Sequence, residues 1–376
     1  MSNRHDIKRD AFMLHGPLKG KGYDWWWHSF TGVNDATGEE KQFFVEYFTV
    51  NPGRVRKTEV ILGQDEKHKA LHDKPSYGMI KAGTWGKDKA QINRYYPWSE
   101  VKVKKGTPFE IKMGESICSE NRIKGSVQLK YMEAKEHPEY MSDFGTMEWD
   151  LNVDKRIAFN VGYGASGILR HLNAFEMYWH AEGIKTCYTG YVIYNGERYT
   201  VSYDGSYGYA DKNWGSDFTS PWVWLSSCNL ESELTGNKLL NSAFDIGGGR
   251  PVVLSVPLER KLLGQFTYEG VDYEYNFSKF WTGSKTEFSV EETDEKVIWH
   301  VKQENRTSVM VTDISCRKED MLFINYESPD GEKRHKRLFN GGTGEGEISL
   351  YRKSQSGLFL IDRIRAKSVG CEYGEY

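Results

Sequence analysis

The segment from Tyr203 to Asn229 brings together the residue types that acid–base chemistry needs. It reads YDGSYGYADKNWGSDFTSPWVWLSSCN, so that a carboxylic acid (Asp211), an amine (Lys212) and an amide (Asn213) follow one another among aromatic residues. Each of these polar groups needs a partner if it is buried, because an unpaired buried polar group costs about 1–3 kcal/mol. The segment is therefore either a solvated turn or a preorganised site.

Three carboxylates are candidates for a catalytic acid. Protonating an alkene, or moving a proton on a phenol, needs an acid with a raised pKa in a dry pocket. Asp211 is one candidate, and Glu176 is another because it shares a predicted strand face with Tyr178 and His180. Glu46 is the third, since its predicted strand surrounds it with apolar side chains that favour the neutral acid. The alternatives are a turn cap for Asp211, an ordered polar face for Glu176 and an ion pair for Glu46.

Aromatic side chains offer walls for a pocket around Asp211. A cation that forms during a reaction would be stabilised by an indole face, by about 0.5–2 kcal/mol per contact. Side chains alternate along a strand, so Trp25 and Trp27 share one face and Trp222 and Trp224 share another. Core packing is the alternative for these rings, as a structural role is for His28. The residues that we expect to bind substrate are Lys212, Asn213, Trp214, Trp179, Tyr178, Trp25, Trp27, His28, Tyr209, Trp222 and Trp224.

Composition argues against several other classes of protein. A net charge of −3 gives no electrostatic case for a nucleic-acid partner. No window approaches the roughly 20 apolar residues of a membrane span, and the N-terminus lacks the apolar region of a secretory signal. The five cysteines are scattered and form no CxxC pair, which argues against disulfides and zinc and fits a reducing cytoplasm. We expect no metal and no cofactor, and we interpret the glycine-rich run 341–346 as a flexible turn rather than a phosphate loop.

Most of the chain divides into short apolar runs separated by Gly, Asn, Asp and Pro, which predicts strands. Asn195-Gly196 divides two of them and predicts a hairpin turn. Many short strands at this spacing are typical of β-sandwiches and barrels, so the predicted class is all-β, with short helices only near Gly167–Phe175 and after Pro138. The expected strands are 42–50, 92–96, 126–131, 147–153, 186–194, 198–203, 222–228, 252–256, 273–277, 286–290, 297–301, 321–326 and 356–364.

Two domains of similar plan are predicted. The length alone favours two. The order aromatic cluster, polar turn and apolar strand occurs at Tyr23–Val50 and again at Pro221–Val256, although the residues themselves do not recur. This echo predicts a first domain over residues 1–217, which carries DKNWG at its end, and a second domain over residues 218–376.

An ordered string of motifs resembles the central signature of the tocopherol cyclase family. The motifs are Ala210-Asp211-Lys212-Asn213-Trp214-Gly215, Trp222-Val223-Trp224, Cys228-Asn229 and Gly247-Gly248-Gly249-Arg250, preceded by Phe175-Glu176-Met177-Tyr178-Trp179 and by the hairpin from Gly190 to Gly196. Asp211 stands where the family has Glu, which shortens the reach of the acid by one methylene group. Met177 and Tyr178 stand where the family has Pro-His.

The resemblance implies a pair of lipocalin-like (calycin) antiparallel β-barrel domains with a site near their junction. It also implies proton-initiated ring closure of a prenylated phenol to a chroman, without a cofactor. In this hypothesis Asp211, or Glu176 in its place, delivers the proton, and His180 or Glu46 accepts the proton of the phenol. Lys212 and the neighbouring amide would hold the acid or the substrate oxygen.

Other functions are compatible with the same residues. The acid could protonate an alkene that water then attacks, as in a hydratase, or the reverse dehydration could occur. An oxygen could add to an activated alkene and close a flavonoid-type ring without a cation. A lipocalin-like carrier would bind an apolar ligand and do no chemistry, because a barrel fold does not decide function.

Overall fold

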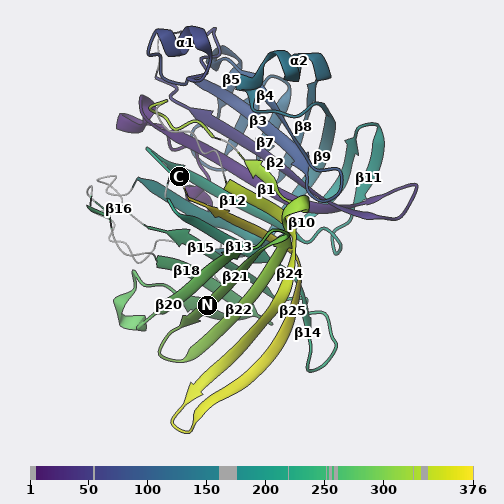
Figure 1. Cartoon of the computed structure of the whole chain (residues 1–376), viewed down its shortest axis with the longest axis vertical. Helices are drawn as coiled ribbons and strands as arrows, with labels where there is room; N and C mark the ends of the chain where they lie inside the picture. Colours follow the sequence, from purple (N-terminus) through teal and green to yellow (C-terminus); the bar gives the residue numbers. More distant parts are fainter. Residues whose placement is uncertain are drawn as a thin grey trace.

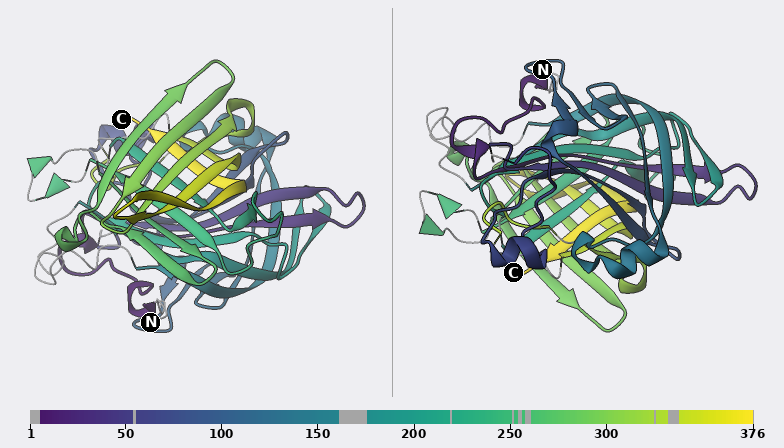
Figure 2. Two further views of the ribbon diagram at one scale, coloured as in Figure 1. Left: turned by 90° about the horizontal axis from the view of Figure 1, so that it is seen from below. Right: turned by 90° about the horizontal axis from the view of Figure 1, so that it is seen from above.

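The computed structural model folds the chain almost entirely into antiparallel strands (Figure 1). It describes residues 6–53, 56–160, 176–218, 220–250, 252–253, 256–257, 261–324, 326–331 and 338–375. These residues form a 12-stranded sheet, an 11-stranded sheet and one two-stranded ribbon. Both large sheets curl into barrel-like shapes (Figure 2). The predicted all-β class with two lipocalin-like antiparallel sheets is confirmed.

The first sheet is the upper one in Figure 1 and uses the N-terminal part of the chain. Its path runs β4-β3-β2-β1-β11-β10-β9-β8-β7-β6-β5, and β12 pairs with both β1 and β10. The strand that carries DKNWG therefore lies inside the sheet, with a partner on each side. The strands are β1 (Tyr23–Asn34), β2 (Glu40–Val50), β3 (Tyr77–Thr84), β4 (Ala90–Tyr96), β5 (Val101–Val103), β6 (Glu110–Met113), β7 (Ser116–Ser119), β8 (Arg122–Leu129), β9 (Gly145–Phe159), β10 (Met177–Tyr194), β11 (Glu197–Val201) and β12 (Gly208–Gly215).

The second sheet is the lower one and uses the C-terminal part of the chain. Its path runs β19-β18-β15-β13-β25-β24-β22-β21-β20, with β14 on β25 and β23 on β24, while β16 and β17 form the separate ribbon. The strands are β13 (Trp222–Ser227), β14 (Asn229–Ser232), β15 (Ala243–Gly249), β16 (Val252–Val253), β17 (Val256–Pro257), β18 (Lys261–Tyr268), β19 (Val271–Tyr275), β20 (Lys285–Glu292), β21 (Lys296–Glu304), β22 (Ser308–Arg317), β23 (Leu322–Ile324), β24 (Leu338–Ser354) and β25 (Gly357–Gly374).

Helices are short in the described part of the chain. None is long and apolar enough to cross a membrane. A short helix was expected after Pro138, where the structure has a 3-10 turn, and the one expected at 167–175 lies outside the described residues. The helices are α1 (Glu66–Ala70) and α2 (Tyr131–Glu136), with the 3-10 turns η1 (Ile7–Arg9), η2 (Gly16–Lys19), η3 (Trp98–Glu100), η4 (Pro138–Tyr140), η5 (Phe280–Thr282) and η6 (Lys318–Asp320).

Two local predictions have opposite outcomes. The Asn195-Gly196 hairpin is confirmed, because Tyr194 pairs with Glu197 where β10 turns into β11. The flexible turn at 341–346 is wrong, since these residues belong to β24. The glycines there serve close packing: a Cβ on Gly342 would lie 2.2 Å from a ring atom of Trp85.

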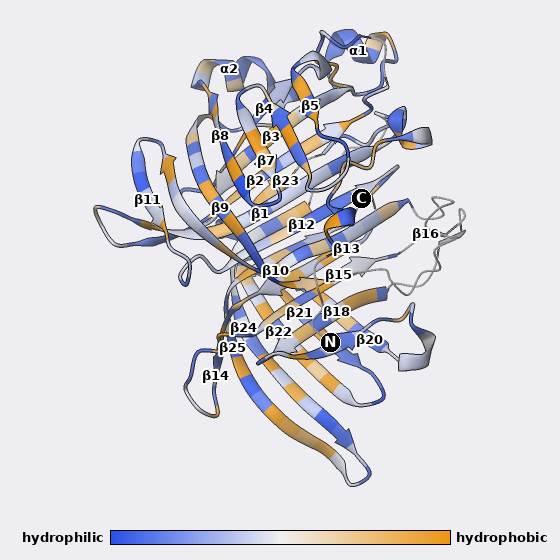
Figure 3. Ribbon diagram, turned by 180° about the vertical axis from the view of Figure 1, so that it is seen from behind, coloured by the Kyte–Doolittle hydropathy of each residue, from blue (hydrophilic) through white to orange (hydrophobic). Residues whose placement is uncertain are grey.

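Apolar residues form separate cores inside each sheet and a third core where the sheets meet. Exposed charged and buried apolar residues alternate along β25 from Arg363 to Lys367, and Figure 3 shows apolar and polar bands along the β24–β25 hairpin. The third core takes Trp27 and Phe44 from the first sheet and Trp224 and Leu338 from the second. The first sheet ends at Gly215 and the second begins seven residues later, while the division into domains at residue 217 stays a prediction. The junction core is where the candidate site lies.

Candidate active site at the junction of the sheets

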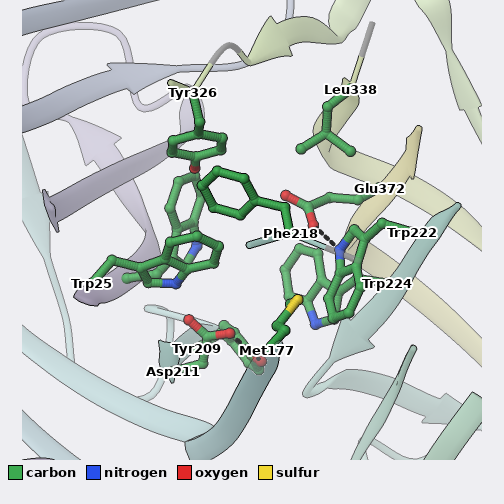
Figure 4. A pocket seen from close by; sticks show the side chains of 11 residues that line it. Trp25, Met177, Tyr209, Asp211, Phe218, Trp222, Trp224, Tyr326, Leu338 and Glu372 are labelled. Atoms are coloured by element: carbon green, nitrogen blue, oxygen red, sulfur yellow. Dashed lines mark hydrogen bonds between the residues drawn. The ribbon is translucent and has the colours of Figure 1, made fainter. Parts of the chain in front are cut away.

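A small aromatic cavity lies between the two sheets (Figure 4). Its volume is about 40 Å³, which is room for a few water molecules. Two carboxyl groups reach into it, Asp211 from β12 and Glu372 from β25, and the other lining groups are mainly aromatic. The lining residues are Trp25, Trp27, Met177, Tyr209, Asp211, Phe218, Trp222, Trp224, Tyr326, Leu338 and Glu372.

On the first sheet, one row of residues crosses four strands; we call it the floor, and its members Asp211 and Trp27 line the cavity. Asp211 of β12 pairs with Trp27 of β1, which pairs with Glu46 of β2. Glu46 in turn pairs with Lys81 of β3. Side chains directly opposite each other on neighbouring strands point to the same face of a sheet. The register of the strands therefore aligns an acid, an indole, a second acid and an amine.

The facing wall on the second sheet is built in the same way. Glu372 of β25 pairs with Trp224 of β13 on one side and with Asn340 of β24 on the other. The amide Nδ2 of Asn340 donates to Glu372 Oε1 at 2.5 Å, and Trp85 Nε1 of the first sheet donates to the amide oxygen of Asn340 at 2.7 Å. Hydrogen bonds thus connect Trp85, the residue after β3, with the row of the second sheet across the junction.

Asp211 is a carboxyl group in surroundings that keep it protonated. Its Oδ2 accepts hydrogen bonds from Trp179 Nε1 at 2.9 Å and from Tyr209 OH at 3.4 Å. Burial, reinforced by the nearby charge of Glu372, raises the pKa of Asp211 to about 8 even though these hydrogen bonds act in the opposite direction. At neutral pH this group is a proton donor.

Glu372 is held in a less apolar setting than Asp211. Trp222 Nε1 donates to its Oε2 at 2.6 Å, in addition to the bond from Asn340. Burial raises the pKa of Glu372 to about 7, while the two hydrogen bonds and the ammonium group of Lys81 limit the rise. Near neutral pH a large share of the Glu372 carboxyl groups is ionised, so the cavity contains an acid and a potential base.

Glu46 and Lys81 form a second titratable pair beside the cavity. Tyr326 OH donates to Glu46 Oε2 at 3.2 Å, and the Nζ of Lys81 lies 4.2 Å from the centroid of the Tyr326 ring. Burial raises the pKa of Glu46 to about 7 against the opposing charge of Lys81. Burial lowers the pKa of Lys81 to about 8. Tyr326 connects this pair to the cavity wall.

Indole N–H groups hold the carboxyl groups of the junction in a repeated arrangement. Trp179 binds Asp211 and Trp222 binds Glu372, and Trp224 Nε1 donates to Asp245 Oδ1 at 3.0 Å. Glycines opposite the rings make this possible, since a Cβ on Gly247 would lie 2.7 Å from the Trp179 ring. A role for Gly247 of the GGGR motif is thereby explained: it admits the indole that positions the acid.

Three polar atoms along the floor have no hydrogen-bond partner within the described residues. They are Oδ1 of Asp211, Nε1 of Trp27 and Oε1 of Glu46, all buried. Leaving a buried polar atom unpaired costs about 1–3 kcal/mol, so such atoms mark positions for water or for polar groups of a ligand. Because the three atoms belong to residues of one row, the floor carries a line of polar atoms, whereas the other walls of the cavity are mainly aromatic.

Half of the DKNWG motif faces away from the cavity, which corrects the expectation that all of it binds substrate. Neighbouring side chains of a strand point to opposite faces, so Lys212 and Trp214 lie on the other side of β12 from Asp211. Lys212 forms a buried ion pair with Asp24, and its Nζ lies 3.7 Å from the centroid of the Trp26 ring. Its role there is structural.

The other expected residues on that face also lie away from the cavity. Tyr178 stacks on Trp214 with a centroid separation of 5.5 Å, and His180 Nε2 lies 3.3 Å from Asp10 Oδ1 inside the first sheet. His28 Nδ1 lies 2.9 Å from Tyr188 OH, also within the core of the first sheet. The physical reason is again the alternation along β10 and β1.

Two further expected residues are not in the wall of the cavity. Glu176 directly precedes β10, and its carbonyl oxygen accepts from Ser216 N at 2.8 Å. Asn213 lies on the same strand face as Asp211, and its side-chain oxygen accepts from Tyr23 OH at 2.7 Å. The residues of the expected set that the structure brings together in the wall are Asp211, Trp25, Trp27, Tyr209, Trp222 and Trp224.

Sequence reasoning missed Glu372 and Lys81. A usable signal existed for Lys81, because it is an isolated charge inside the apolar run YGMIKAGT, as Glu46 is inside FFVEYF. Isolated opposite charges in two apolar strands indicate that the strands pair. Glu372 carries no comparable signal, because its hydrogen-bond donors Trp222 and Asn340 lie 150 and 32 residues away along the chain. No group of three or more His, Cys, Asp or Glu side chains suited to a metal ion occurs in the described part of the chain.

The fold and the cavity define an all-β, lipocalin-like protein with an acidic aromatic site between its two sheets. The family model described as tocopherol cyclase-like matches residues 90–374. The chain therefore belongs to the tocopherol cyclase-like family, which supports an enzyme of the cyclase or hydratase type. No curated protein matches its sequence.

Solved structures resemble the chain in fold. An AttH-type protein from Nitrosomonas europaea is 10% identical, with 98% of this chain and 97% of that one covered and a TM-score of 0.45. Kievitone hydratase from Nectria haematococca is 12% identical over 100% of this chain and 95% of its own, with a TM-score of 0.47. CghA is 9% identical over 95% and 89%, also with a TM-score of 0.47. None of these likenesses carries an argument about substrate or mechanism.

Proposed function

We propose that the protein is a cofactor-independent acid–base cyclase or isomerase that closes a ring by C–O bond formation on an apolar phenolic or prenylated small molecule. One observation carries the proposal: a carboxyl group with a pKa of about 8, Asp211, shares an aromatic cavity with a second carboxyl group whose pKa is about 7, Glu372. Two acids whose environments separate their pKa values supply an acid and a base at the same pH.

In the proposed reaction the proton of Asp211 is transferred to a substrate alkene. The electron pair of the double bond forms the new C–H bond and leaves a cation on the neighbouring carbon. The phenolic oxygen attacks that carbon, and its proton passes to the carboxylate of Glu372. The product is an isomer of the substrate, and the enzyme is restored when the proton on Glu372 exchanges with solvent and Asp211 is protonated again.

The aromatic walls suit a substrate that becomes positively charged during the reaction. Trp25, Trp222 and Trp224 line the cavity, as do Tyr209 and Tyr326. An indole face stabilises a nearby cation by about 0.5–2 kcal/mol, with the higher value for a desolvated contact. No lysine or arginine is among the residues that line the cavity in the described part of the chain, so no positive charge opposes cation formation at its wall.

Substrate binding requires movement of side chains. A cavity of about 40 Å³ is far below the roughly 300–1,000 Å³ of pockets that take drug-sized ligands. Phe218, from the segment between the sheets, and Met177, at the start of β10, line the cavity, and a methionine adapts its shape readily. The described state is a closed form in which aromatic side chains occupy the space that the ligand would fill.

Hydration of an alkene is the second candidate, and the unpartnered floor atoms favour it. A water molecule among Asp211 Oδ1, Trp27 Nε1 and Glu46 Oε1 would have polar partners next to the proton donor. Glu46, with a pKa of about 7, could then accept a proton from that water as it attacks the cation. Turnover in H₂¹⁸O separates the two reactions, because solvent oxygen enters the product only in the hydratase.

The replacement Asp211→Asn tests the proposal. We expect ligand binding and the thermal unfolding midpoint to be retained while turnover falls by about 10²–10⁴-fold, the usual size of an acid–base contribution. Asp204→Asn is the matched control, since Asp204 is an exposed acid of the same segment. A protein that binds prenylated phenols with no turnover in any variant would instead be a carrier.

A further inference from the structure

The β24–β25 hairpin extends beyond the strands on both of its sides (Figure 1, yellow end of the second sheet). On one side, pairing with β22 ends where Ser308 meets Arg352. On the other side, pairing with β14 ends where Ser232 meets Ile364. Residues 353–358 therefore form a two-stranded ribbon. Residues 359–362 of β25 pair with β24 where β24 still pairs with β22, and they have no strand on their other side among the described residues. Such a ribbon is only marginally stable on its own in water.

The end of this ribbon exposes three consecutive apolar residues. Leu358, Phe359 and Leu360 are 57%, 49% and 41% exposed. Because side chains alternate along a strand, Leu358 and Leu360 lie on one face and Phe359 on the other. We call these three residues the apolar tip. A contiguous exposed apolar group on a projecting element marks a contact surface rather than a packing position.

Cationic side chains surround the apolar tip. Arg352 pairs across the hairpin with Phe359. Arg363 lies two residues after Ile361, and both arginines are exposed. Arg306 is exposed in the neighbouring turn between β21 and β22. The acid nearest in sequence, Asp362, is buried at 1% and accepts from Ser232 and Tyr268 hydroxyl groups. A second acid at this end, Glu304, accepts from the ammonium group of Lys353 at 2.9 Å, so its charge is paired. Arg352, Arg363 and Arg306 therefore leave a positive balance of exposed charge among these residues.

We propose that the apolar tip inserts into the surface of a lipid bilayer that contains anionic lipids. Leucine and phenylalanine enter the boundary between headgroups and acyl chains, while arginines beside them attract lipid phosphates and carboxylates. A second copy of the chain is a less suitable partner, because pairing two tips would bring their arginines together. The proposal goes beyond the proposed reaction and does not depend on it, although an apolar substrate would itself reside in such a bilayer.

Co-sedimentation of the full chain with vesicles tests the proposal. The probes are vesicles of phosphatidylcholine alone and of phosphatidylcholine with phosphatidylserine. We expect binding to the anionic vesicles, at least tenfold weaker for Leu358→Ser/Phe359→Ser/Leu360→Ser, and about fivefold weaker for each of Arg352→Gln and Arg363→Gln. The matched control is Leu71→Ser/Met132→Ser/Val271→Ser, which removes three apolar residues of 59%, 57% and 55% exposure from separate elements. The control should bind as the unmodified protein does.

Two outcomes would overturn the proposal. The first is absence of binding to anionic vesicles, or equal binding by the tip variant and the unmodified protein. The second is self-association that the tip variant abolishes in sedimentation velocity without lipid, since the tip would then be an interface between copies. Circular dichroism spectra of each variant and of the unmodified protein are compared, so that a loss of vesicle binding can be distinguished from unfolding.

Discussion

Asp211 and Glu372 are chemically similar groups to which the junction assigns different roles. Burial raises the pKa of both, to about 8 and about 7. The difference arises from their neighbours. Hydrogen bonds from Trp222 and Asn340 and the ammonium group of Lys81 lower the pKa of Glu372, whereas the charge of Glu372 raises that of Asp211. One carboxyl group is thereby suited to donate a proton and the other to accept one.

The rate of the reaction should show a bell-shaped dependence on pH. Asp211 must be protonated, so activity falls as pH rises through about 8, and Glu372 must be ionised, so activity falls as pH drops through about 7. We expect kcat/KM to be greatest between these values. Because the groups interact, the two limbs belong to the pair as a whole. A rate that rises steadily above pH 9 would contradict the assignment of Asp211 as the acid.

Removing one indole donor should move mainly one limb of that profile. Trp222→Phe deletes the N–H that binds Glu372 Oε2 at 2.6 Å, and this bond lowers the pKa of Glu372. The acidic limb should therefore shift to higher pH, and by more than the alkaline limb moves. Trp98→Phe, which removes an indole bond to the carbonyl oxygen of Val50, should leave the profile unchanged. The readout is the pH dependence of kcat/KM for the three proteins.

At the scale of strands, the site is two rows of side chains set by register. Alternation along a strand could be predicted from the sequence, and it correctly grouped Trp25 with Trp27 and Trp222 with Trp224. The same rule, applied to DKNWG, separates Asp211 from Lys212, which our expectation had placed together. Register between distant strands leaves no local signal, so the meeting of Glu372 with the first sheet could not be predicted.

Enlarging one glycine of the GGGR motif should disturb the acid from the opposite sheet. Gly247→Ala would place a Cβ 2.7 Å from the Trp179 ring, so the ring must shift from Asp211. We expect a loss of about 1–3 kcal/mol in the free energy of unfolding, as for other overpacked sites, together with lower turnover. Gly236→Ala in an exposed turn has no atom within 4 Å of the new Cβ but has a positive φ of +72°, so it serves as a control for backbone strain alone. Urea unfolding and turnover of the two variants provide the comparison.

At the scale of the whole molecule, the class of fold was accessible from composition and strand spacing, while the way the sheets meet was not. Turn residues and alternating patterns recur locally, so they predict many antiparallel strands. The glycine-rich run 341–346 misled for a physical reason. Gly342 admits Trp85, the residue after β3, and Gly346 lets the backbone of β22 approach, and such contacts exist only in the folded chain.

The buried acids should make the protein less stable as pH rises. Asp211, Glu46 and Glu372 have folded-state pKa values of about 8, 7 and 7, above their ordinary values. The folded state therefore binds more protons than the unfolded state, and its stability is lost as pH rises through these values. For each group, the free energy of unfolding falls by about 1.4 kcal/mol for every unit by which burial raises its pKa. Urea unfolding should give a larger free energy at pH 5 than at pH 8.

The double replacement Asp211→Asn/Glu46→Gln should flatten this dependence. Both side chains would then be neutral at every pH, so only Glu372 among the three would still titrate. The control Asp35→Asn/Glu148→Gln replaces two exposed acids. It should leave the pH dependence of the free energy of unfolding unchanged. Stability that increases between pH 5 and pH 8 would show that these carboxyl groups are ionised throughout.

The indole–carboxyl bonds of the junction also give the protein an optical property. Trp179, Trp222 and Trp224 each direct a ring N–H at an acid whose charge varies with pH, and two of these rings line the cavity itself. Ultraviolet emission from an indole depends on the charge and polarity around the ring. The intrinsic fluorescence of the unlabelled protein should therefore change both when its acids ionise and when a ligand enters. Candidate substrates can be ranked by the affinity that this change in fluorescence reports before any product is known.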